Sequence, residues 1–129
     1  MMSEQTSLED ILVDEEELNE ELLATTVGKY VNIGKDSGDL IPKEPFKELG
    51  SKGKIVVALL AQKARFELDM TEEEWLTPAA INELTGVKKG TIYPGVRDLA
   101  HEDIVRDEDG EYIIPSVKVE TAKEYLEGD

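Results

Sequence analysis

The spacing of apolar residues predicts three helices between residues 51 and 101. The strongest pattern starts at Ser51, the predicted N-cap, and runs to about Leu68 with one broad apolar face. The positions on this face are Ile55, Val56, Leu59, Leu60, Ala64 and Leu68. This helix is therefore expected to be the first helix of the domain and its central packing element.

A short helix and then a longer one are predicted after this central helix. Thr77 followed by Pro78 supplies an N-cap and a first-turn proline, and Gly86 is the residue type that commonly follows a helix end. The longer helix is predicted from about Ile92 to about His101. Its buried face would carry the apolar residues that recur at four- and three-residue steps, namely Ile92, Val96 and Leu99.

Proline at position 94 constrains the start of the longer helix. A proline in a helix interior removes a backbone hydrogen bond. If Thr91 is the N-cap, Pro94 falls in the first turn, where backbone N–H groups have no partner inside the helix. The sequence therefore predicts that this helix begins just after Thr91.

Two β-hairpins are predicted, one on each side of the three helices. The first spans Lys29–Lys43, with strand residues at 30–33, a turn at 34–39 and a return strand at 40–41. The second has a strand at 104–106, a turn at Asp109-Gly110 and a return strand at 112–114. A final helix is predicted over Val117–Leu126.

The N-terminal stretch is strongly acidic. Residues 1–24 carry nine acidic side chains and no basic one, with leucine and isoleucine residues between them. One interpretation is a disordered tail or a single frayed helix. The other is an amphipathic helix over residues 8–22. Such a helix would bind a partner protein or mask the middle of the same chain, residues 28–65, where basic residues outnumber acidic ones. Residues 1–26 are thus predicted to form an extension to a domain at 27–129. Within this domain, the first hairpin occupies residues 27–50, the three helices and the second hairpin occupy 51–116, and the last helix occupies 117–128.

The order of elements indicates an α+β fold of the winged helix-turn-helix type. A short helix, a glycine turn and a longer helix form the helix-turn-helix, and the second hairpin forms the wing. The run from Thr77 to Pro115 resembles winged helix-turn-helix regulators of bacteria and archaea. Within it, Gly90-Thr91-Ile92-Tyr93-Pro94 followed by Val96-Arg97-Asp98-Leu99 is similar to the PadR family.

The resemblance implies a DNA-contacting role for the longer helix, but not a ligand or a mode of dimerisation. The chain departs from the family at the turn after that helix, in its short C-terminal helix and in the first hairpin. A recognition helix lies in the major groove of duplex DNA, where lysines meet phosphates and arginine reads guanine. The predicted DNA-binding residues are Lys88, Lys89, Gly90, Thr91, Tyr93, Pro94, Arg97 and Arg106, with supporting phosphate contacts from Lys52 and Lys54.

The charge of the chain argues against this function. The net charge is −16, and four of the five residues of the predicted wing turn, 107–111, are acidic. Such a surface repels nucleic acid at long range. Two alternatives follow: an acidic winged-helix module that binds protein and not DNA, or a regulator from a high-salt, halophilic cytoplasm, where screening weakens the repulsion.

Composition argues against several other classes of function. The chain has no cysteine and one histidine, His101, so a thiolate or multi-histidine metal site is excluded, and neither a metal nor a cofactor is expected. It has no glycine-rich phosphate loop and no carboxylate pair in an apolar setting, so an enzyme is not expected. Without a signal peptide or an apolar run of membrane-spanning length, a cytoplasmic protein is predicted. Whether it forms a homodimer is left open.

Overall fold

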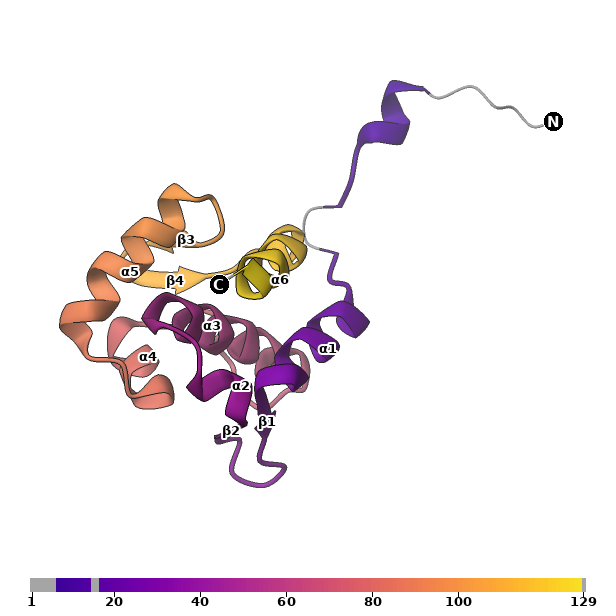
Figure 1. Ribbon diagram of the computed structural model, residues 1–129. Coiled ribbons are helices and arrows are strands. Elements are labelled where there is room, and N and C mark those ends of the chain that lie inside the picture. Colours follow the sequence, from indigo (N-terminus) through magenta and orange to yellow (C-terminus); the bar gives the residue numbers. More distant parts are fainter. Residues whose placement is uncertain (1–6, 15–16, 129) are drawn as a thin grey trace.

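Helix α3 (Ser51–Glu67) runs through the middle of the protein, and the other elements pack around it (Figure 1). The structure is a computed structural model that describes residues 7–14 and 17–128. Over these residues the fold is α+β, with two separate antiparallel hairpins. The remaining elements are η1 (Leu8–Ile11), α1 (Glu20–Tyr30), β1 (Val31–Ile33), β2 (Leu40–Pro42), α2 (Glu44–Lys47), α4 (Pro78–Thr85), α5 (Lys89–His101), β3 (Arg106–Glu108), β4 (Glu111–Ile113), η2 (Ser116–Lys118) and α6 (Val119–Gly128).

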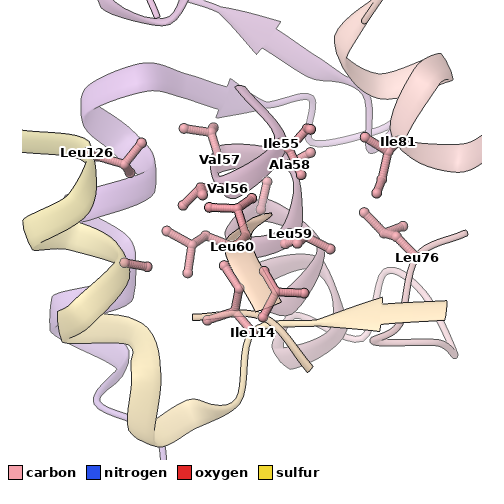
Figure 2. Close-up of a cluster of buried hydrophobic side chains, with 14 of the residues drawn as sticks. Ile55, Val56, Val57, Ala58, Leu59, Leu60, Leu76, Ile81, Ile114 and Leu126 are labelled. Carbon is pink, nitrogen blue, oxygen red and sulfur yellow. The ribbon is translucent and has the colours of Figure 1, made fainter. Parts of the chain in front are cut away.

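Helix α3 is buried on all sides over nine consecutive residues, from Ile55 to Lys63. A helix of a globular protein that is apolar all round must be covered all round. Figure 2 shows how this is done: Leu76 and Ile81 lie on one side of α3, Leu126 lies on the opposite side, and Ile114 lies below it. The central role predicted for this helix is confirmed, although its apolar surface is wider than the single face that the pattern suggested.

Helix α1 belongs to the domain, so the predicted boundary at residue 26 is wrong. Its N-cap is Asn19, whose side-chain oxygen accepts a hydrogen bond from the Leu22 amide at 2.9 Å. Leu23, Val27 and Tyr30 lie one helical turn apart and are all buried, in a helix that packs against α3 and α6. Tyr30, predicted to be in a strand, is the last residue of this helix. The acidic composition of the segment favoured an extension outside the domain, although the spacing of its apolar residues supports a packed helix.

The predicted amphipathic helix over residues 8–22 does not form as one element. A single 3-10 turn, η1, is closed by a hydrogen bond from the Ser7 amide to Asp10 Oδ2 at 3.0 Å. Residues 12–14 and 17–19 are not helical, and the parts of the N-terminal predictions that fall on residues 1–6 and 15–16 lie outside the described residues. Residues 7–14 project from the body of the protein (Figure 1) and expose the apolar side chains of Leu8, Ile11, Leu12 and Val13.

The hairpin predicted at Lys29–Lys43 is confirmed in its strands. β1 and β2 pair antiparallel, with Val31 opposite Pro42 and Ile33 opposite Leu40. Gly38 has a φ of 77°, a conformation that suits glycine, and it lies in the turn region. Helix α2 follows directly and buries Phe46 against the core.

Helix α5 begins earlier than predicted, and Thr91 is not its N-cap. The amides of Thr91 and Ile92 donate to the Lys88 carbonyl at 2.9 and 3.0 Å, which makes Lys88 the cap and Lys89 the first helical residue. Pro94 therefore lies inside the helix and leaves the carbonyl of Gly90 without its usual donor four residues on. Gly90 is exposed, so solvent can satisfy that carbonyl group. By contrast, α4 has the predicted cap, since Thr77 Oγ1 accepts from the Ala80 amide at 3.2 Å, and Gly86 ends it with a φ of 79°.

The second hairpin, β3–β4, has the predicted turn. Asp109 and Gly110 both have positive φ, 53° and 80°, as a two-residue type I′ turn requires. Leu76 adds an antiparallel bridge to Tyr112, so the segment before α4 lies beside this hairpin. η2 then leads into α6, which starts at Val119, two residues later than predicted, and packs on α3 and α1.

A buried lysine joins α3 to the segment before α4. Lys63 is 2% exposed, and its Nζ pairs with Glu74 Oε2 and lies 3.4 Å from Ser116 Oγ. A buried ammonium group is stable only when it is paired and hydrogen-bonded. Among residues 7–14 and 17–128, no helix has the length and apolar character needed to cross a membrane.

The assignment of α1 to the domain predicts different costs for two leucine substitutions. Leu23→Ala should lower the free energy of unfolding by about 2–5 kcal/mol, because Leu23 is 3% exposed and its loss leaves a cavity. Leu12→Ala should change it by less than about 0.5 kcal/mol, because Leu12 is 75% exposed. Urea unfolding of the two variants measures both values, and equal effects would show that α1 is not part of the folded domain.

Candidate nucleic-acid interface

Helix α5 has one face fixed in the core and one face in solvent. Ile92, Val96 and Leu99 are buried, as predicted. Gly95 lies on the same face, and a Cβ atom there would come within 2.9 Å of Ile55 Cδ1 on α3. The two helices therefore approach closely at Gly95, and this contact sets which side of α5 points outward.

The solvent face of α5 contains every residue of this helix and its cap that was predicted to contact DNA. All are exposed: Lys88, Lys89, Gly90, Thr91, Tyr93, Pro94 and Arg97. The ion pairs found within residues 7–14 and 17–128 do not involve Lys88, Lys89 or Arg97. This face therefore presents three positive charges that an external anion could approach.

Lys52 and Lys54 of α3, which were predicted to support DNA binding, are placed differently from the exposed cations of α5. Lys52 Nζ lies 3.4 Å from Asp98 Oδ2 of α5, and this hydrogen bond raises the pKa of the Lys52 ammonium group above its usual value. Its charge is thus already partly balanced. Lys54 lies on the α2 side of α3, with Nζ 5.8 Å from the centre of the Phe46 ring. The structure does not bring Lys54 to the exposed face of α5.

Arg106 lies on the far side of the β3–β4 hairpin from α5. It is paired in register with Ile113, and the two residues line a hollow that also includes Trp75. The next pair, Asp107 and Tyr112, faces the opposite way because side chains alternate along a strand. The sequence therefore grouped Arg106 with the helix α5 residues, but the structure separates them.

A groove runs between α5 and the hairpin, with a volume of about 380 Å³. Tyr93 and Arg97, both predicted site residues, line it from α5. The sequence prediction missed the other polar residues of the groove: His101 from the end of α5, Asp107 from β3 and Tyr112 from β4. The turn at Asp109-Gly110 held the missing signal, because a two-residue turn fixes Asp107 opposite Tyr112.

Groups of opposite charge surround the phenol of Tyr112 in this groove. Burial of this side chain raises its pKa above the usual value, and the nearby charge of Asp107 and the phenol of Tyr93 act in the same direction. Arg97 acts in the opposite direction. A carboxylate and a guanidinium group therefore lie at the same groove, so Asp107 of the acidic hairpin faces α5, whereas Glu111 lines a different hollow.

Comparison with known proteins adds no assignment to this surface. No protein-family model, no curated protein and no solved structure matches the chain. The similarity of residues 90–99 to PadR regulators therefore stays a prediction. Function has to be inferred from the exposed face of α5 and the groove beside it.

The raised pKa of Tyr112 predicts a loss of stability at alkaline pH. The folded state favours the neutral phenol, so this contribution is complete below the unfolded pKa of about 10 and is lost as the pH rises through the folded pKa. Tyr112→Phe should therefore reduce the fall in unfolding free energy above about pH 10. Urea unfolding across this range measures it. Matching curves for Tyr112→Phe and the wild type would contradict the assignment.

Proposed function

We propose that the protein is a DNA-binding regulator with a winged helix-turn-helix fold. α4, the turn at Gly86 and α5 would form the helix-turn-helix, and β3–β4 would form the wing. The order of elements, the left-handed glycine between the helices and the packing of both helices on α3 support this proposal.

The observation that carries the proposal is the positive charge on the outer face of α5, whose cations form no ion pair with the residues that the structure describes. Lys88 and Lys89 lie at the N-terminal end of the helix, where first-turn amides also favour an anion. Both lysines would contact phosphates. Arg97 lies two turns further along, at the groove that faces the hairpin. It is the side chain best able to form a bidentate contact with guanine, and Thr91 and Tyr93 would contact neighbouring base edges.

The acidic hairpin limits the strength of such binding. Asp107 lies in the same groove as Arg97, and the net charge of the chain is −16. Approach to DNA would therefore be slow at low ionic strength and would improve as salt screens the long-range repulsion, while each phosphate contact is itself weakened by salt. Affinity would rest on a few short-range contacts from α5.

A protein-binding module is the second candidate, and the N-terminal segment favours it. Four large apolar side chains, Leu8, Ile11, Leu12 and Val13, are each at least 69% exposed and stand beside acidic residues. Exposed apolar side chains gathered in one short segment are typical of sites that bind a partner. This candidate becomes the main one if α5 proves not to bind DNA.

The proposal predicts that three cations of α5 control DNA affinity. Replacing Lys88, Lys89 and Arg97 together by alanine should weaken binding to random-sequence duplex DNA by at least about tenfold, since each is a direct contact. If both lysines contact phosphates, the slope of log affinity against log salt should fall by about 1.8. Fluorescence anisotropy across a salt series measures both quantities.

The control for this experiment removes the same charge elsewhere. Lys29, Lys35 and Lys47 are exposed and lie in α1, the first turn and α2. Their triple alanine variant has the same net charge as the α5 variant and should keep the wild-type slope. Equal loss in both variants would mean that only net charge matters, and no binding by the wild-type protein would remove the DNA proposal.

The position of Asp107 predicts a gain in affinity on neutralisation. Asp107→Asn should strengthen DNA binding by about twofold to fivefold at low salt, because it removes a negative charge from the groove that Arg97 lines. The gain should shrink as salt increases. Asp69→Asn makes the same chemical change just beyond the C-terminal end of α3, at a residue that does not line the groove, and should have little effect. An equal gain in the two variants would place the hairpin away from DNA.

A further inference from the structure

The N-terminal arm, residues 7–14, exposes four large apolar side chains to solvent. Leu8, Ile11, Leu12 and Val13 are each at least 69% exposed. The arm lies before α1 and projects from the body of the protein (Figure 1), so these side chains are open to another molecule. Apolar side chains gathered in this way are typical of a segment that binds a partner.

The arm also belongs to the most acidic part of the chain. Residues 1–24 carry nine acidic side chains and no basic one, so they account for nine of the sixteen excess negative charges. Within the arm, Glu9 and Asp10 stand between the exposed apolar residues. A surface that binds the arm must therefore combine apolar groups with positive charge.

The outer face of α5 and the groove beside it have both properties. Lys88, Lys89 and Arg97 are exposed and form no ion pair with any residue that the structure describes. The groove that Arg97 lines also has apolar walls, contributed by Tyr93, Val96, Ala100 and Tyr112. Tyr93 is 50% exposed, so its ring can contact a docked side chain. An acidic and apolar segment therefore finds complementary groups on this one surface.

Other basic positions of the chain fit the arm less well. In the middle segment, residues 28–65, the lysines at 47, 52 and 63 are already paired with carboxylates of the same chain. The hollow beside Arg106 has apolar walls, but Glu67 and Glu74 line it as well. Of these surfaces, only the face of α5 offers several cations without such partners.

We propose that the arm of one copy docks on the α5 face of a second copy, and that two copies exchange arms. The apolar side chains of the arm enter the groove beside Tyr93, and its carboxylates pair with the cations of α5. The exchange is reciprocal, as in a two-fold symmetric dimer, so the second contact forms at a high effective concentration. The docked arm covers the face that would meet DNA, and this consequence rests on the proposed function, whereas the contact itself does not.

Repulsion between two acidic bodies does not prevent this contact. Without residues 1–24 the chain has a net charge of only −7, because all fourteen basic residues lie outside that segment. At physiological ionic strength, charges are screened beyond about 8 Å. The ion pairs and apolar contacts of the arm act at shorter distances than this, so they are weakened less.

Sedimentation equilibrium of the full-length protein tests the exchange without DNA. The average mass should rise from that of one copy toward that of two, with a dissociation constant of about 0.1 mM or tighter. Ile11→Ser combined with Leu12→Ser should weaken this association at least about tenfold, because it removes two apolar contacts. Ile41→Ser combined with Leu68→Ser makes the same two changes at exposed positions of β2 and the end of α3, and it should leave the association unchanged.

Variants of the cations test the other side of the contact. Replacing Lys88, Lys89 and Arg97 together by alanine should also weaken the association at least about tenfold, since each would pair with a carboxylate of the arm. The alanine variant at Lys29, Lys35 and Lys47 has the same net charge and should associate like the wild-type protein. All substituted positions are exposed, so these variants should fold.

A mixture of two variants locates the contact. The ¹⁵N-labelled Ile11→Ser/Leu12→Ser protein keeps an intact α5 face, and the unlabelled α5 alanine variant keeps an intact arm. Adding the second to the first should shift the amide signals of α5 in a ¹H–¹⁵N spectrum. Adding unlabelled Ile11→Ser/Leu12→Ser protein instead should not shift them.

Three results would overturn the arm exchange. They are a wild-type protein that stays a single copy up to about 1 mM, dimers that survive both the arm and the α5 changes, and α5 signals that do not shift in the mixture. No DNA is present in these measurements. Loss of the DNA proposal with intact association therefore leaves the arm exchange standing, and DNA binding by a protein that does not associate removes only the exchange.

Discussion

The burial of α3 on every side is the constraint on which the rest of the structure depends. Nine consecutive residues, from Ile55 to Lys63, are shielded from solvent, and one neighbouring helix cannot shield them all. α1, α4, α5 and α6 therefore all pack on the same helix. Because Gly95 allows α5 to approach Ile55 closely, the same packing fixes which residues of α5 face outward. The candidate interface is thus a consequence of how α3 is covered.

The partners of the lysines and arginines matter more for function than the net charge does. Lys63 is paired with Glu74 inside the protein, Lys52 with Asp98, and Lys118 with Asp103. These pairs hold elements together and leave little charge for a ligand. The cations of α5 have no such partners among the described residues. A chain of net charge −16 can therefore still present a locally basic helix face.

The parts of the fold that depend on local chemistry could be predicted from the sequence, and the parts that depend on packing could not. Asp109-Gly110 specified its turn, and Thr77 and Gly86 specified the ends of α4, because caps and turns act within a few residues. The predicted start of α5 was wrong, because Pro94 suggested a later cap, whereas the helix begins at Lys89 and includes the proline. The face to which Arg106 points depends on the elements that surround the hairpin, and no local sequence pattern reports that.

One strand register separates the groove beside α5 from the hollow that Arg106 and Ile113 line. Pairing of Asp107 with Tyr112 turns both toward α5, and pairing of Arg106 with Ile113 turns both toward Trp75. The groove also adjoins a hollow between α3 and α4, because Tyr112 lines the groove and its bridge partner Leu76 lines that hollow. These two residues exchange backbone hydrogen bonds of 2.8 and 2.9 Å. A displacement of Leu76 would have to move Tyr112 or break both bonds, so the groove beside α5 and the hollow behind it are mechanically joined at this bridge.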